Sequence, residues 1–220
     1  MEQSTLKFLR LLIPGIIIVI ISYCFIQIIT DKKFGDLDFS EYSIPLFVAL
    51  VFGALYQTFN IRFLITNYTH KQIDLNIKRN IMNLYVGNLS ATQTQYLFKK
   101  DRLKNVFYKI IDSDPSLSAK GKNVYFNGLL WTSFADTFII SILSSIFILI
   151  FTLFNSTNTD DLRTLSFFLL LIALASICFH FVAFLNHIKI SNSQIEFIET
   201  NHIMDVKNII DKILSENNVL

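Results

Sequence analysis

The chain has 220 residues, of which 52% are hydrophobic and only 16% are charged. A water-soluble domain carries about 25% charged residues, and the mean hydropathy of this chain is correspondingly high at +0.49. This composition excludes an ordinary soluble globular protein, because so much apolar surface needs lipid to cover it. The net charge of +2 is small, so its distribution along the chain is more informative than its sum.

Residues 1–66 predict a hairpin of two membrane-spanning helices. The first apolar run has no small-residue cleavage pattern, so we interpret it as a retained span at about residues 9–30 and not as a signal peptide. A short acidic connection, residues 31–43, leads to a second span at about residues 44–66, which only Arg62 interrupts. Three residues of the second span suit helix packing: Ala49, Gly53 and Gln57.

Residues 67–131 form the only long polar stretch and carry ten Lys or Arg against four acids. Apolar residues recur there at spacings of three or four, which predicts amphipathic helices with Ser90 or Thr92 as one N-cap. Asp114 and Pro115 predict the start of a third short helix, or an ordered loop, that leads to Trp131. The two apolar stripes are Ile73, Ile77, Ile81 and Leu84, and then Tyr96, Leu103, Phe107 and Ile110.

Residues 132–186 predict a second hairpin, with spans at about 134–155 and 164–186. The connection between these spans is short and acidic. The remaining segment, residues 187–220, is an amphipathic tail that we expect to be helical. Its apolar residues are Ile203, Val206, Ile210 and Ile213.

The Lys and Arg distribution predicts the orientation of this four-span arrangement. The head, the central stretch and the tail lie on one side and carry the basic excess, whereas both short connections are net acidic. Positive charge gathers in cytoplasmic loops. We therefore expect a multi-pass protein of the cell inner membrane with both termini in the cytoplasm.

Three ionisable residues fall at similar depth in the inner part of the bilayer: Arg62, Asp136 and His180. Charges inside a membrane are energetically costly and tend to pair or to face water. One hypothesis is that Arg62 and Asp136 pair and form, with His180, a polar ring or gate at the inner mouth. The alternative, which is the commoner case near helix ends, is that each side chain extends to the interface without a partner.

Span three and span four also carry small and hydroxyl residues on single helix faces. Such a stripe can line a wet path, but it more often lets helices approach closely. We keep both interpretations, with packing as the commoner one. The candidate path-lining residues are Thr137, Ser141, Ser144, Ser145 and Ser176.

Motifs for catalysis and for metal binding are missing from the sequence. There is no H-E-x-x-H, P-loop, G-x-S-x-G or C-x-x-C pattern, and the four histidines are scattered. We therefore expect no enzyme, metal site or cofactor, and no nucleic-acid partner. The basic stretch can contact an anionic small ligand or a soluble cytoplasmic partner, or it can simply lie beside anionic lipid. Its candidate contact residues are Lys78, Arg79, Lys99, Lys100, Arg102 and Lys104.

One segment of about thirty residues resembles a known class of proteins. The segment comprises Phe107-Tyr108, Asp112-Ser113-Asp114, Asn127-Gly128-Leu129-Leu130-Trp131-Thr132-Ser133 and Asp136. It is similar to small multi-span proteins of bacterial anti-phage defence systems, including four-span effectors associated with nucleotide second messengers. The resemblance implies a protein that oligomerises and that disrupts or senses the membrane.

The sequence thus predicts an all-α, polytopic membrane protein with four transmembrane helices in two hairpins, a helical cytoplasmic insert and an amphipathic C-terminal helix. We expect a homo-oligomer in the lipid bilayer that forms a pore, or disrupts the membrane, under control from the cytoplasmic side. The alternative is a non-conducting sensor or scaffold that recruits a soluble partner.

Overall fold

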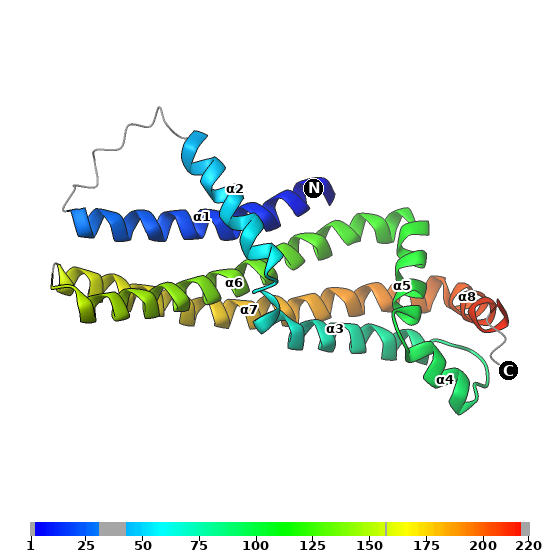
Figure 1. Cartoon of the computed structure of the whole chain (residues 1–220). Coiled ribbons are helices and arrows are strands. Elements are labelled where there is room, and N and C mark those ends of the chain that lie inside the picture. The colour runs from blue at the N-terminus through cyan, green and yellow to red at the C-terminus, as the bar shows by residue number, and fades with distance from the viewer. Residues whose placement is uncertain (1–2, 31–42, 157, 217–220) are drawn as a thin grey trace. The chain divides into compact units, whose positions relative to one another are not determined.

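The computed structural model describes residues 3–30, 43–156 and 158–216, and every regular element in these ranges is an α-helix (Figure 1). The predicted all-α class is therefore confirmed. The expected acidic connection falls mostly on residues 31–42, which lie outside the described ranges. The helices are α1 (Gln3–Thr30), α2 (Ser43–Thr58), α3 (Phe63–Asn83), α4 (Ala91–Phe98), α5 (Arg102–Ser113), α6 (Pro115–Phe154), α7 (Thr159–Asn201) and α8 (Ile203–Glu216).

The chain folds into two compact units. The first, which we call the apolar unit, consists of residues 1–66 and 128–183. The second, which we call the charged unit, consists of residues 67–127 and 184–220. The boundaries between the units fall within the residue ranges of α3, α6 and α7.

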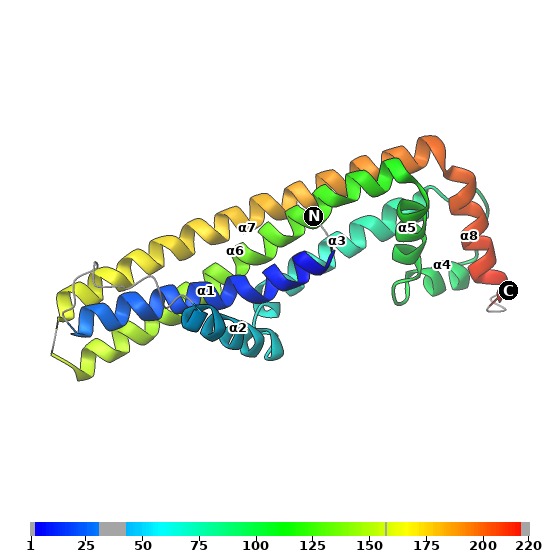
Figure 2. The same cartoon turned by 90° about the horizontal axis from the view of Figure 1, so that it is seen from above.

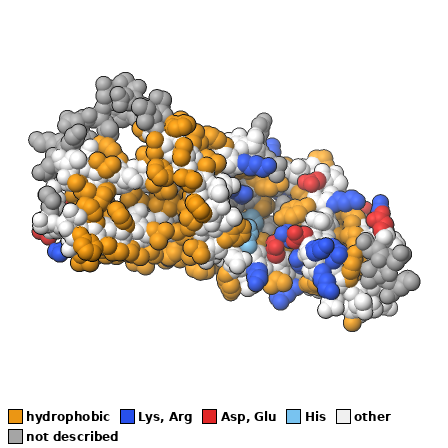
Figure 3. Space-filling model, in the orientation of Figure 1, with side chains coloured by type: hydrophobic (Ala, Val, Ile, Leu, Met, Phe, Trp, Pro, Cys, Tyr) orange, Lys and Arg blue, Asp and Glu red, His pale blue; other side chains and the backbone are white. Residues whose placement is uncertain are grey.

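Three helices, α1, α6 and α7, are long and apolar enough to cross a membrane. The bent pair formed by α2 and α3 raises this number to four if the pair counts as one span. The apolar unit exposes many large hydrophobic side chains; Leu64 is 78% exposed and Phe154 is 82% exposed. Hydrophobic side chains cover the visible face of this unit, whereas Lys, Arg, Asp and Glu gather on the charged unit (Figure 3). This surface is suited to lipid and not to water.

The second predicted span is broken and not continuous. Helix α2 ends at Thr58 and α3 begins at Phe63, and the two helices are bent by 61°. Asn60, between them, has a positive φ of 50°, a left-handed conformation that Asn adopts more readily than most residues and that ends helices. The bend follows from this local backbone choice.

Within the apolar unit, α6 and α7 lie side by side (Figure 1 and Figure 2). Ile148, Leu162 and Leu169 form a buried core, and Phe25 of α1 packs against it. The ring of Phe25 meets those of Phe147 and Phe151 edge to face. Aromatic and aliphatic contacts therefore hold α1 on the α6–α7 pair.

Helices α1 and α2 approach each other closely through small residues. A Cβ added to Gly15 would overlap the carbonyl oxygen of Ala49, and one added to Gly53 would overlap that of Leu11. Ala49 and Gly53 are buried, so their predicted packing role is confirmed, whereas Gln57 is exposed. Close backbone contact of this kind is a common way for membrane helices to associate.

The charged unit buries the apolar stripes that the sequence indicated. Ile77, Ile81 and Phe107 are at most 2% exposed. Ser90 forms a reciprocal capping box with Gln93 at the start of α4, as one of the two predicted caps requires. The other members of the first stripe, Ile73 and Leu84, are buried too, as are Leu103 and Ile110 of the second, while Tyr96 is half-buried.

The expected short third helix or loop before Trp131 is wrong, because α6 is one continuous helix. Asp114 caps its first turn by accepting hydrogen bonds from the backbone N–H groups of Ser116 and Leu117 at 2.7 and 3.0 Å. After Pro115 no proline interrupts the helix. The only glycines, Gly121 and Gly128, are tolerated within a helix at modest cost.

We expect Gly15→Ala to weaken the α1–α2 contact. The added methyl group meets backbone and not a movable side chain, so overpacking destabilises the fold by about 1–3 kcal/mol. Thermal unfolding of the whole protein in mild detergent measures the loss. Gly121→Ala is the matched control, because its Cβ meets nothing within 4 Å. This control is expected to be neutral or to stabilise the helix by up to about 1 kcal/mol, and equal losses for both variants would contradict the close α1–α2 contact.

Candidate functional site

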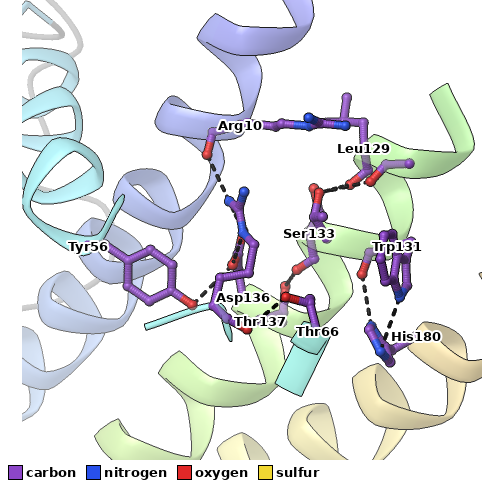
Figure 4. A network of polar contacts seen from close by, with 12 residues as sticks. Arg10, Tyr56, Thr66, Leu129, Trp131, Ser133, Asp136, Thr137 and His180 are labelled. Atoms are coloured by element: carbon purple, nitrogen blue, oxygen red, sulfur yellow. Dashed lines mark hydrogen bonds and ion pairs between the residues drawn. The ribbon is translucent and has the colours of Figure 1, made fainter. Parts of the chain in front are cut away.

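The turn between α2 and α3 places Arg62 against Asp136 of α6. The guanidinium Nε donates to Asp136 Oδ1 at 2.8 Å, and Nη2 donates to Oδ2 at 2.6 Å. Tyr56 of α2 donates its hydroxyl to the same Oδ1 at 3.0 Å (Figure 4). Asp136 is only 1% exposed, so the paired guanidinium and the phenol take the place of water around the carboxylate. The alternative in which Arg62 reaches the interface without a partner is wrong.

Arg62 also satisfies a backbone carbonyl of α1. Pro14 lies inside α1 and has no N–H, so it cannot donate to the carbonyl of Arg10 four residues earlier. Arg62 Nη2 donates to this oxygen at 3.0 Å. An unpaired carbonyl in an apolar surrounding costs several kcal/mol. One guanidinium therefore links α1, the α2–α3 turn and α6.

Arg10 adds a second cation to this group, which we call the Arg62 cluster: Arg10, Tyr56, Arg62 and Asp136. The Arg10 side chain is half-buried, and its Nε is enclosed without a hydrogen-bond partner in the described part of the chain. With two guanidinium groups and one carboxylate, the cluster carries a formal excess of one positive charge. Such a group inside apolar surroundings is a default candidate for function.

His180 belongs to a different hydrogen-bonded group from the Arg62 cluster. Its Nδ1 lies 3.0 Å from the carbonyl oxygen of Trp131, and the Trp131 indole N–H donates to its Nε2 at 3.2 Å. This arrangement requires the neutral imidazole with its proton on Nδ1. Within one subunit the three predicted residues therefore belong to two hydrogen-bonded groups, and His180 connects α7 to α6 (Figure 4).

One pair of buried hydroxyl residues connects α6 and α7. The hydroxyls of Ser145 and Ser166 lie 2.7 Å apart, and each also bonds the backbone carbonyl of the other residue. Ser141, Ser145 and Ser176 are buried within the subunit. Thr137 and Ser144 are half-buried, and Thr137 donates to the carbonyl of Ser133 in its own helix at 2.9 Å.

The basic residues of the charged unit divide into paired and unpaired groups. Lys104 contacts Asp74 at 2.9 Å, and Lys78 lies 3.8 Å from Asp101 and donates to the carbonyl of Lys100. Arg102 donates to the carbonyls of Tyr96 in α4 and of Lys99, which caps the end of that helix. Three of the six predicted contact residues, Lys78, Arg102 and Lys104, are thus engaged internally, and Arg79, Lys99 and Lys100 are exposed.

Sequence reasoning missed two cations that share a groove with Arg102. Lys109 lies seven residues after Arg102 on α5, and Lys212 lies on α8. The spacing of Arg102 and Lys109 puts both on one helix face, so the sequence alone could have indicated this pair. The meeting with α8 could not be read from spacing, because it depends on tertiary contact.

His202 joins the start of α8 to the start of α6. Its Nδ1 lies 2.8 Å from Asp205 and its Nε2 lies 2.9 Å from Asp114. Hydrogen bonds to Asp205 and then Asp114 raise the pKa of the imidazole above its ordinary 6.5. The backbone N–H of Leu117, followed by His202, lowers the pKa of Asp114.

Comparisons with protein-family models, curated proteins and solved structures found no match to this chain. Within the described ranges, no group of three or more His, Cys, Asp or Glu side chains is arranged to hold a metal ion. The two cysteines, Cys24 and Cys178, are unpaired. The candidate functional residues are therefore the Arg62 cluster and, separately, the cations Arg102, Lys109 and Lys212 that share a groove.

A double-mutant cycle tests whether Arg62 and Asp136 act together. We expect Asp136→Ala or Arg62→Ala alone to destabilise the protein by about 3–5 kcal/mol, since each leaves a buried charge without its partner. The double variant should lose at least about 1 kcal/mol less than the sum of the two. Unfolding in mild detergent gives these free energies, and strict additivity would contradict the coupling.

We expect the stability of α8 to fall as pH rises through the folded-state pKa of His202. A raised pKa means that the stabilising contribution is complete below pH 6.5 and disappears above the folded value. Hydrogen-exchange protection factors of α8, measured from about pH 6 to about pH 9, follow this loss. His202→Gln should remove the pH dependence, and a slope that survives in this variant would exclude His202 as its source.

Proposed function

We propose that this protein is a homo-oligomeric integral membrane protein that forms a pore or disrupts the membrane, with the Arg62–Asp136 pair as its latch. The observation that carries the proposal is the enclosed two-pronged ion pair at the break between α2 and α3. Broken spans with polar groups at the break occur where a membrane protein lines a cavity or moves.

The physical reason for a latch is the cost of enclosing charge. A buried ion pair stabilises a fold weakly, because desolvation offsets most of the Coulomb attraction, yet losing one partner is severe. The pair therefore strongly favours one arrangement of α2 and α6 over other arrangements that would separate the two charges. An event that hydrates both groups together would release that arrangement at moderate free-energy cost.

We propose four spans in two hairpins, with α2 and the first part of α3 as the second span. The basic excess of the central stretch then favours a cytoplasmic location for both termini, and the inner membrane is the expected location. Four packed helices fill their own centre with side chains. A conducting path therefore requires several subunits.

The resemblance to anti-phage membrane proteins extends this proposal to a role in defence. In that role a cytoplasmic anionic ligand or a soluble partner would bind the charged unit and release the latch. The chemistry of membrane permeation needs no catalytic residue, metal or cofactor, and we propose none.

The alternative is a non-conducting sensor or scaffold that recruits a soluble partner through the charged unit. One observation favours it: Ser141, Ser145 and Ser176 are buried, and Ser145 is engaged in helix packing. These side chains are then not available to line a wet path within one subunit.

Induced expression separates the two functions. We expect Asp136→Asn to raise dye uptake several-fold over the wild type at equal amounts in the membrane, since the amide cannot pair with Arg62 as an ion. The matched control is Asp160→Asn with Arg163→Gln, an ion pair whose side chains are 96% and 63% exposed; it should leave uptake unchanged.

Two results would contradict the pore. The first is dye uptake that stays at the uninduced level in both the wild type and Asp136→Asn. This result would favour the non-conducting sensor or scaffold. The second is a monomer in mild detergent and in native-membrane crosslinking, because a single subunit has no path of its own.

A further inference from the structure

A groove in the charged unit lies between one face of α5 and one face of α8. It has a volume of about 460 Å³, within the range of small-molecule sites. From α5 come Arg102, Asn105, Val106 and Lys109, and from α8 come Ile209, Lys212, Ile213 and Glu216, with Tyr96 of α4 at one edge. Both helices contribute residues at the spacing i, i+3, i+4 and i+7, which belongs to a single helix face.

The groove has an excess of positive charge. Arg102, Lys109 and Lys212 face one acid, Glu216, which lies 3.6 Å from Lys212. Lys109 is exposed, and it makes no ion pair within the described ranges. Like charges gathered without enough counter-charge leave a positive potential that attracts anions.

Arg102 is held in place with part of its donor capacity remaining. Its Nη1 donates to the carbonyls of Tyr96 and Lys99 at 2.7 and 3.0 Å, and its guanidinium lies 3.6 Å above the Tyr96 ring. Nε and Nη2 make no hydrogen bond to another described residue. A fixed guanidinium edge of this kind matches the oxygens of a phosphate.

We propose that this groove binds a small phosphate-bearing anion through Lys109, Lys212 and the remaining donors of Arg102. Two lysines and one arginine suit one or two phosphate groups, and they are too few for a nucleic-acid strand. Both a soluble organic phosphate and a lipid headgroup carry this chemistry. The inference deepens the proposed function and rests on it for the consequence of binding, because it names the class of ligand that would release the latch.

The test uses the full chain in nanodiscs of neutral phosphatidylcholine, with ATP and inorganic tripolyphosphate as probes in titration calorimetry. We expect binding with Kd below about 1 mM that weakens as salt rises. Lys109→Gln with Lys212→Gln should weaken it at least tenfold, since two charge-assisted contacts are lost. The charge-matched control, Lys122→Gln with Lys189→Gln, removes two exposed lysines outside the groove and should change affinity less than about twofold.

A variant that is expected to strengthen binding tests whether misfolding explains the loss of binding in the lysine variants. Glu216→Gln removes the only acid among the described residues that line the groove and should tighten binding by about threefold. Damage to the fold would not strengthen binding. The inference is overturned if neither probe binds at millimolar concentration, or if the groove variant and the control variant weaken binding equally.

Nanodiscs that contain phosphatidylglycerol distinguish the two sources of phosphate. If lipid headgroups occupy the groove, these discs raise the apparent Kd for ATP even at a salt concentration that screens the charge of the bilayer. A site for soluble ligands keeps the Kd that it has in neutral discs at the same salt concentration. Binding and permeability are separate readouts. ATP binding without dye uptake would support the ligand site and contradict the proposed pore. Dye uptake without ATP binding would support the pore and contradict the ligand site.

Discussion

The structure of the apolar unit depends on one guanidinium group. Arg62 neutralises Asp136, which is enclosed on all sides, and it donates to the Arg10 carbonyl that Pro14 leaves without its helical partner. Each of these groups alone would be costly in apolar surroundings. Arg62 satisfies both from a turn that is itself possible because Asn60 adopts a left-handed conformation. The costs and gains of Pro14, Asn60, Arg62 and Asp136 therefore balance only when all four residues are present.

Helices and their buried faces were largely predictable from local pattern. The spacing of Ile73, Ile77 and Ile81 indicated a buried helix face, and Ser90 and Asp114 cap helices as their side chains allow. Length and hydropathy alone indicated the apolar runs. These signals depend on residues within a few positions of each other, so they can be recognised from a single sequence without knowledge of the tertiary structure.

Features that depend on tertiary contact could not be predicted in the same way. The sequence indicated Arg62 and Asp136 as candidates, but depth alone also grouped His180 with them, and the structure bonds His180 to Trp131. Continuous α6 was missed because a capped start at Asp114 indicates where a helix begins and not how far it extends. Lys212 entered the groove only through the packing of α8 on α5, which no local spacing encodes.

The contact between Trp131 and His180 makes the protein its own optical reporter. Trp131 is the single tryptophan of the chain, and its buried indole N–H donates to the imidazole of His180 in α7. When light beyond the absorption of the eight tyrosines is used for excitation, the emission therefore originates where α6 meets α7. Any rearrangement that slides these two helices past one another changes the surroundings of that one fluorophore, without a label being introduced.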